Sequence, residues 1–421
     1  MKRFLALLLV LLTLSGCSGF ANKDNIINLL SSPKLSQRES EIVESIKAHL
    51  GRDIILKYPK QGENVSPVQI TDLSGDGTDQ AVVLYTAPGQ GGNVRMAVLT
   101  ASDEGWRIDY DSEGYGTEFY KIIFANLDGE NGRQIIVGYT FADSSEKILA
   151  VYSADDGNIR EVEYRSCQDF IVEDVTGDDV SDIVLAGINS DNKHTQLRIL
   201  SNQGNSALAV VAAKQLSVPN SRVTNIIVSD TDFSDKNAIL LDYTDSYFRV
   251  YTQAVYYEDY NLKTVLAPDV VQKRWVYDYS LNSKDVDGDG FAETPTVILS
   301  DFSSSENLKF MEWTCFLLNE PVRKYYGFGE ADSGLYFPLP DEWQNLVSLR
   351  YGEDKNIWQV VRISDETVLA QFDLLSTGYS YELEDNQSMA SSGTLQVRIT
   401  FDESVTTDQR EYITNGMMYI K

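Results

Sequence analysis

Residues 283–299 have the sequence S-K-D-V-D-G-D-G-F-A-E-T-P-T-V-I-L. The first half is an acidic, glycine-containing stretch, which is typical of a tight turn. The second half is apolar and contains β-branched residues, which favour a β-strand. The segment therefore predicts an acidic turn that leads directly into a strand.

The same order of an extended run, an acidic turn and an apolar strand occurs four more times along the chain. The other copies are residues 70–85, 122–139, 171–187 and 226–243. The first turn residues of the five copies are Asp72, Asn126, Asp174, Ser229 and Asp285. These positions are 54, 48, 55 and 56 residues apart. A unit of about 50 residues has the length of a four-stranded propeller blade.

The repeat predicts a mainly β fold, with a β-propeller of about five four-stranded blades over residues 53–330; six or seven blades are the alternatives. One amphipathic helix is expected before it, over residues 36–52. Ser36 and Glu39 form a capping-box pattern, and Ile42, Val43 and Ile46 follow at helical spacing. A small α+β domain is expected over residues 331–421, with four strands and a terminal helix.

The repeats resemble the FG-GAP or VCBS repeats of integrin-α-like β-propellers, as found in bacterial surface lipoproteins. The resemblance covers roughly residues 53–329 and rests on the recurring turn pattern. It implies a β-propeller with a calcium loop near the start of each blade.

The fifth turn is the best candidate for a calcium site. Calcium takes about six to eight oxygen ligands, and a tight loop can supply them from alternate positions. Gly290 would allow the sharp bend at position 6. The candidate ligands at positions 1, 3, 5, 7 and 9 are Asp285, Asp287, Asp289, the Phe291 carbonyl and Glu293. Four crowded carboxylates repel one another without a cation. The alternative is a hydrogen-bonded turn that caps the hairpin with no metal.

Two further turns are possible calcium sites with fewer charges. In the third turn the candidate ligands are Asp174, Thr176, Asp178, Val180 and Asp182, and Asp179 replaces the glycine. In the first turn they are Asp72, Ser74, Asp76, Thr78 and Gln80. The second turn, with Asn126, Asp128, Glu130 and Gln134, is expected to be structural. The fourth has lost the pattern, with Ser229 and Phe233 at positions 1 and 5.

The N-terminus predicts export and lipid anchoring. Lys2 and Arg3 precede an apolar run over residues 4–14, which is shorter than the roughly 20 residues of a membrane-spanning helix. The following Leu14-Ser15-Gly16-Cys17 resembles a bacterial lipobox. The resemblance implies a signal peptide over residues 1–16, a lipid on Cys17, a tether over residues 17–35 and a place on the extracytoplasmic face of the cell membrane. The alternative is an ordinary signal peptide.

Composition excludes several classes of function. The net charge of −28 argues against nucleic acid and against broad contact with anionic lipid, and it suits cation binding. The chain has only two histidines, His49 and His194, which argues against a catalytic triad and a histidine-ligated zinc site. Cys167 and Cys315 are expected to be buried free thiols, although a disulfide between them is the alternative.

The expected function is non-catalytic binding or scaffolding at the cell surface, with a surface protein or polysaccharide as partner. The alternative is an extracellular carbohydrate-active enzyme or glycan-binding protein that uses carboxylates and aromatic side chains at the propeller mouth. Two aromatic rows on strands could stack on sugars, or could pack between blades. These rows are Tyr247 and Tyr251, and Trp275, Tyr277 and Tyr279.

Overall fold

A computed structural model gives the fold of the chain. It describes residues 35–89, 92–142, 144–155, 158–188, 194–202, 207–219, 221–231, 236–265, 272–274, 281–298, 307–317, 321–375 and 381–420. The predicted signal peptide, Cys17, the tether up to residue 34 and the second aromatic row lie outside these residues. Within them, the two α-helices are both too short or too polar to cross a membrane.

The structure is mainly β, as predicted, and its strands form six antiparallel sheets. The first sheet contains β1 (Ile55–Leu56), β2 (Val68–Thr71), β3 (Gln80–Thr86), β4 (Arg95–Ser102) and β5 (Gly105–Glu113). The second contains β6 (Glu118–Ala125), β7 (Gln134–Thr140), β8 (Lys147–Asp155) and β9 (Asn158–Cys167). The third contains β10 (Asp169–Glu173), β11 (Asp182–Ile188), β12 (His194–Asn202) and β13 (Leu208–Pro219).

The remaining sheets continue in chain order. The fourth contains β14 (Arg222–Ser229), β15 (Ala238–Thr244), β16 (Val250–Glu258), β17 (Asn261–Thr264) and β18 (Gln272–Arg274). The fifth contains β19 (Glu293–Val297), β20 (Leu308–Phe316), β21 (Pro321–Glu330), β22 (Leu335–Pro338) and β28 (Met418–Tyr419). The sixth contains β23 (Val347–Tyr351), β24 (Ile357–Arg362), β25 (Val368–Leu375), β26 (Gln387–Ser392) and β27 (Leu395–Phe401).

Each predicted repeat lies in one of the first five sheets, with its acidic turn directly before β3, β7, β11, β15 or β19. The first turn joins β2 to β3, the second joins β6 to β7, and the third joins β10 to β11. In the fifth sheet the strand before the turn is reduced to a single bridge between Lys284 and Glu293. The following strands run as an antiparallel meander, as expected for strands joined by short turns.

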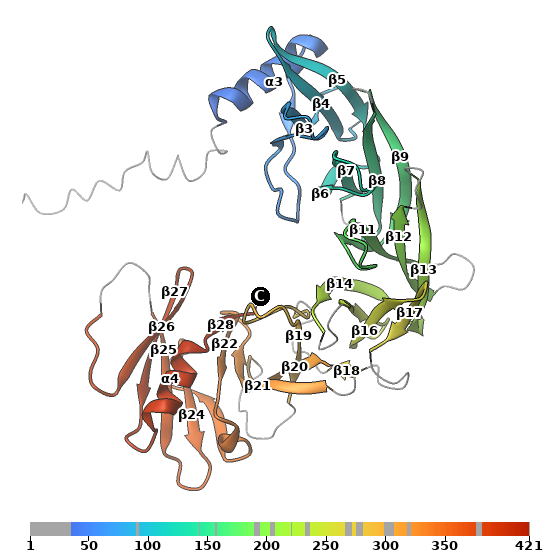
Figure 1. Cartoon of the computed structure of the whole chain (residues 1–421). Helices are drawn as coiled ribbons and strands as arrows, with labels where there is room; N and C mark the ends of the chain where they lie inside the picture. Colours follow the sequence, from blue (N-terminus) through green and yellow to red (C-terminus); the bar gives the residue numbers. More distant parts are fainter. Residues whose placement is uncertain are drawn as a thin grey trace, which may run out of the picture.

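The sheets follow one another along an arc (Figure 1). The main contacts between sheets in the described part of the chain join consecutive ones, such as β5 with β9 and β10 with β14. The arc in Figure 1 is open, with the first and the sixth sheets at its two ends. The four-stranded antiparallel sheets are therefore present, whereas the closed ring of a propeller stays a prediction.

The hydrophobic core lies between consecutive sheets. On β3, Val82 and Leu84 pack against residues of the second sheet such as Val137. The alternate residues Ala81 and Val83 face the N-terminal helix instead. Both faces of β3 and of β7, the strands that follow the first two turns, are covered. These two strands are therefore nearly unbroken apolar runs and do not alternate between apolar and polar residues.

The N-terminal helix α3 spans Gln37–Leu50 and packs on the first sheet. The Ser36 hydroxyl accepts a hydrogen bond from the Glu39 N–H, and the Glu39 carboxylate accepts one from the Ser36 N–H, so the expected capping box is present. Ile42 and Ile46 are fully buried against the sheet. Gly51 ends the helix in the left-handed region at φ 65°.

The C-terminal part shares its core with the fifth sheet. Phe328 of β21 and Phe337 of β22 lie in one cluster with Phe372 of the sixth sheet and Ile413 of helix α4 (Thr407–Asn415). The sequence predicts a domain boundary between residues 330 and 331. In the structure this point lies between β21 and β22, which pair with each other in one sheet. The change in sequence character therefore falls inside a sheet. The sequence predicts that the terminal helix continues to about Met418, but the helix ends at Asn415 and Met418 pairs with Tyr336 in β22.

Candidate cation-binding turns

The first, second, third and fifth acidic turns share one hydrogen-bonded frame, whereas residues 232–235 of the fourth turn, with Phe233, lie outside the described residues. The side chain at position 1 accepts a hydrogen bond from the N–H of position 4 in each. The donors and acceptors are Gly75 to Asp72 (2.7 Å), Gly129 to Asn126 (2.8 Å), Gly177 to Asp174 (2.7 Å) and Gly288 to Asp285 (2.7 Å). These four glycines have φ between 72° and 79°, which glycine adopts at little cost. The sequence pattern predicts the need for a glycine at position 6, but not this one at position 4.

Position 6 behaves as expected in three of these turns. Gly77 and Gly290 have φ of 85° and 91°. Asp179 takes the same region at φ 65°, as an aspartate can. Its N–H donates to the Asp174 carboxylate at 2.9 Å, so the third turn keeps the frame without a glycine at this position.

The side chain at position 9 closes each turn onto the strand that follows. One of its oxygens accepts a hydrogen bond from the N–H of position 2. The pairs are Leu73 to Gln80 (2.6 Å), Leu127 to Gln134 (2.7 Å), Val175 to Asp182 (3.0 Å) and Val286 to Glu293 (3.0 Å). Asp182 and Glu293 are both fully buried.

The turns also connect neighbouring sheets. The N–H of position 8 in one turn donates to the start of the preceding turn. The bonds are Arg133 to the Leu73 carbonyl (2.7 Å), Ser181 to the Asn126 carbonyl (3.0 Å) and Ala292 to the Ser229 hydroxyl (2.8 Å). The acidic turns are therefore junctions between sheets, and a change at their centre affects how the sheets are held together.

The turns differ in what occupies the space between positions 3 and 9. In the second turn, the Gln134 amide donates to the Asp128 carboxylate at 2.6 Å. In the first, the Gln80 amide lies 3.5 Å from the Ser74 hydroxyl. A glutamine at position 9 thus brings its own donor into the centre of the turn.

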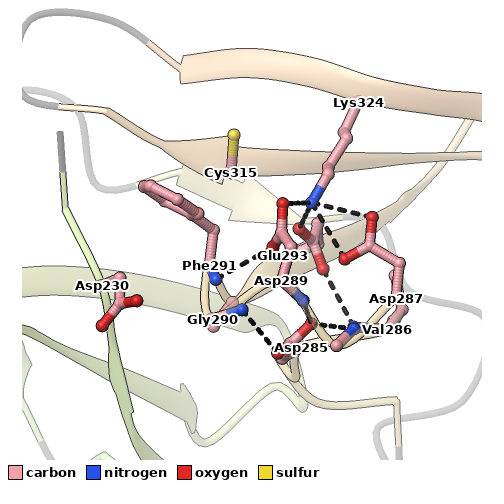
Figure 2. A network of polar contacts seen from close by, with 12 residues as sticks. Asp230, Asp285, Val286, Asp287, Asp289, Gly290, Phe291, Glu293, Cys315 and Lys324 are labelled. Atoms are coloured by element: carbon pink, nitrogen blue, oxygen red, sulfur yellow. Dashed lines mark hydrogen bonds and ion pairs between the residues drawn. The ribbon is translucent and has the colours of Figure 1, made fainter.

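In the fifth turn, the donor is a lysine from another strand. Figure 2 shows the Lys324 ammonium among the carboxylates of the turn. Its Nζ donates to Asp287 (3.0 Å), Asp289 (2.5 Å) and Glu293 (2.8 Å). The Tyr325 hydroxyl also donates to Asp287. Carboxylates of Asp285, Asp287 and Asp289 lie within 4.8 Å of one another, so the structure brings together three of the five predicted ligands.

The charges of this cluster depend on one another. Burial lowers the pKa of Lys324, but the hydrogen bonds to Asp289, Glu293 and Asp287 have a larger effect in the opposite direction. The net result is a pKa well above the usual value of a lysine. Burial also raises the pKa of Glu293, against the lowering effect of Lys324 and the Val286 N–H. The ammonium therefore stays charged and balances carboxylates that would otherwise repel one another.

The third turn has no such donor in the described part of the chain. Asp182 Oδ1 and the Thr176 hydroxyl are both buried, and neither has a hydrogen-bond partner within 3.5 Å among the described residues. The Ser201 and Thr176 side chains nevertheless lie close enough to Asp182 to lower its pKa. Burial raises the pKa of Asp182 more than the nearby hydroxyl and amide groups lower it. These two groups stand at positions 9 and 3, where the sequence predicts calcium ligands. An unpaired buried carboxylate oxygen is costly, and a bound cation would satisfy it.

A polar pocket of about 520 Å³ lies beside this turn. Asp174 and Thr176 line it on one side, and the fourth sheet lines it with Lys236, Tyr257 and Glu258. The Glu258 carboxylate is held by Lys236 and Lys263 in ion pairs. The pocket thus lies between the third and fourth sheets, next to the third turn.

The prediction that Tyr247 and Tyr251 share a strand face is wrong. The prediction that Cys167 and Cys315 are buried free thiols agrees with the structure. Tyr247 lies in the turn before β16 and is 76% exposed, whereas Tyr251 is in the strand and buried, so the two do not share a strand face. Asp245 holds that turn by accepting hydrogen bonds from the N–H groups of Tyr247 and Arg249. Cys167 and Cys315 are free and buried, as expected.

Comparisons with known proteins add little. No family model and no curated protein matches the chain. Among solved structures, it is similar to the exotype rhamnogalacturonan lyase YesX, at 10% identity and a TM-score of 0.32, over 75% of this chain and 73% of that one. It is also similar to Sqt1 of Chaetomium thermophilum, at 9% identity and a TM-score of 0.32, over 83% and 82% of the two chains. These scores support no functional argument.

Proposed function

We propose that the chain is a non-catalytic, calcium-stabilised binding or scaffolding module, anchored by a lipid on Cys17 to the extracytoplasmic face of the cell membrane. In this proposal the first five sheets are blades of an FG-GAP- or VCBS-like β-propeller. The N-terminal sequence supports export and lipid anchoring. The recurring turn and sheet support the repeat, and the acidic side chains of the turns serve mainly to hold its sheets together.

The observation that carries the calcium proposal is the pair of unsatisfied oxygens in the third turn. Asp174, Thr176, Asp178 and Asp182 would hold the ion, together with the Val180 carbonyl. Calcium prefers oxygen ligands, and it would compensate the buried charge of Asp182. When bound, the ion would supply structural stabilisation at a junction between two sheets.

The pocket beside the third turn is the proposed contact for a partner, either a surface protein or a polysaccharide. Its mixed lining of carboxylates, a lysine and a tyrosine suits a polar ligand. Glycan binding or glycan turnover is the alternative, favoured by Tyr257 beside Glu258 and Asp259 in the same pocket. A glycan screen with the purified protein separates these functions: binding without product supports a binding module, and product formation supports an enzyme.

Melting curves test the calcium proposal. We expect calcium to raise the melting temperature of the protein relative to EDTA, because an ion that binds only the folded state stabilises it. Asp182→Asn should abolish this response. It should also stabilise the calcium-free protein by about 1 kcal/mol or more, because the fully buried side chain of residue 182 is then a neutral amide and not a charged carboxylate.

Asp76→Asn in the first turn is the matched control, and it should leave the calcium response intact. Calcium binding at the third turn is ruled out if the wild-type protein melts at one temperature in calcium and in EDTA. It is also ruled out if Asp182→Asn and wild type respond equally to calcium.

A further inference from the structure

The Lys324 ammonium occupies the centre of the fifth turn, where a metal ion would bind. It contacts the carboxylates of positions 3, 5 and 9 at 2.5 to 2.9 Å. Its side chain is only 21% exposed, and Glu293 is fully buried. We propose that Lys324 is the permanent, covalently attached cation of the fifth turn, and that it replaces a metal ion there.

The backbone of β21 explains how the lysine reaches the turn. Trp313 pairs with Tyr325 and Thr314 pairs with Arg323, so Lys324 is the extra residue of a β-bulge. A bulge turns the side chain of the extra residue away from the regular alternation of the strand. Lys324 thereby points at the turn of its own sheet, 31 residues after Glu293 in the sequence.

The first three sheets have the same bulge at the matching place in their last strand. The extra residues there are Asp109, Val162 and Val211. None of them can supply a positive charge. In the first two sheets the turn has a neutral glutamine at position 9, namely Gln80 or Gln134, and needs no cation.

The turns therefore follow one rule: a carboxylate at position 9 requires a cation, whereas an amide does not. Glu293 meets this requirement within the chain through Lys324. In the third sheet, which contains Asp182, the bulge residue is Val211. Among the described residues, Asp182 therefore has no lysine or arginine that would serve as Lys324 does for Glu293. A metal ion in the fifth turn would have to expel the ammonium and break its three ion pairs. This inference does not depend on calcium binding at the third turn.

The test uses the full-length protein in detergent, with Asp182→Asn present throughout so that the third turn does not respond to calcium. Adding Lys324→Met should lower the melting temperature in EDTA by about 5 °C or more, because three carboxylates lose their common partner. Calcium should then restore most of the loss, since the emptied centre can accept an ion.

Glu293→Gln is the compensating change. Together with Lys324→Met, it should recover much of the stability in EDTA and remove the calcium response, because the amide can donate to Asp287 as Gln134 donates to Asp128. The double change also keeps the test usable if Lys324→Met alone does not fold.

Two results would overturn the inference. One is an unchanged melting temperature in EDTA for Lys324→Met. The other is a calcium response in the Asp182→Asn protein that still contains Lys324, if adding Asp289→Asn removes that response. This result would show that the fifth turn binds a metal despite the lysine.

Discussion

At the scale of single residues, Gly75 at position 4 of the first turn decides whether this turn can touch the next one. A Cβ on Gly75 would lie 2.1 Å from the Asn131 carbonyl oxygen in the second turn. The contact is with backbone, which cannot move aside as a flexible side chain can. Gly75 therefore serves both the left-handed conformation of its own turn and the close approach of the next sheet.

Gly75 and Gly77 form a matched pair for testing this point. Both have positive φ, at 72° and 85°, but a Cβ on Gly77 meets no atom within 4 Å. Gly77→Ala should cost only the conformational strain, about 1 kcal/mol. Gly75→Ala should cost clearly more, about 3 kcal/mol, because of the added clash. Equal losses in denaturant unfolding would show that the turns are not held in contact.

At the scale of elements, the residue at the β-bulge decides whether a side chain of the protein supplies the positive charge in the turn. The same bulge carries Lys324 in the fifth sheet and Val211 in the third. Val211→Lys should therefore supply the third turn with its own ammonium and remove the stabilising effect of calcium. Melting curves with and without calcium measure this effect directly.

The control for this exchange is Val162→Lys, at the same bulge in the second sheet. That turn already has an amide donor in Gln134, so the added lysine should leave the calcium response of the third turn unchanged. A calcium response in Val211→Lys equal to that of the wild type would contradict the equivalence of the bulges.

The sequence predicts the turns well because their signal is local. Alternate polar or acidic positions and an adjoining apolar run mark the first, second, third and fifth turns within about 17 residues, and the four-stranded sheets follow from the spacing of the repeats. Lys324 could not be predicted this way, since no local pattern marks a lysine that reaches the turn through a bulge on another strand. The extent of the fifth sheet was also hidden, because its last strand comes from residues 418–419.

At the scale of the whole molecule, stability depends on contacts between successive sheets. Three core clusters lie between the first and second, the second and third, and the third and fourth sheets, and the turn-to-turn hydrogen bonds run along the same series. The net charge of −28 opposes this compact arrangement through self-repulsion. Cations at the turns, whether lysine or calcium, therefore act where acidic groups are most crowded and sheets meet.

Calcium titration calorimetry of the full-length protein tests this account most directly, at about 0.15 M salt to screen weak surface binding. We expect a single specific site, which Asp182→Asn removes and Asp289→Asn leaves in place. No binding, or a site that survives Asp182→Asn and is lost in Asp289→Asn, would contradict the account, because calcium would then be absent from the third turn or bound where Lys324 lies.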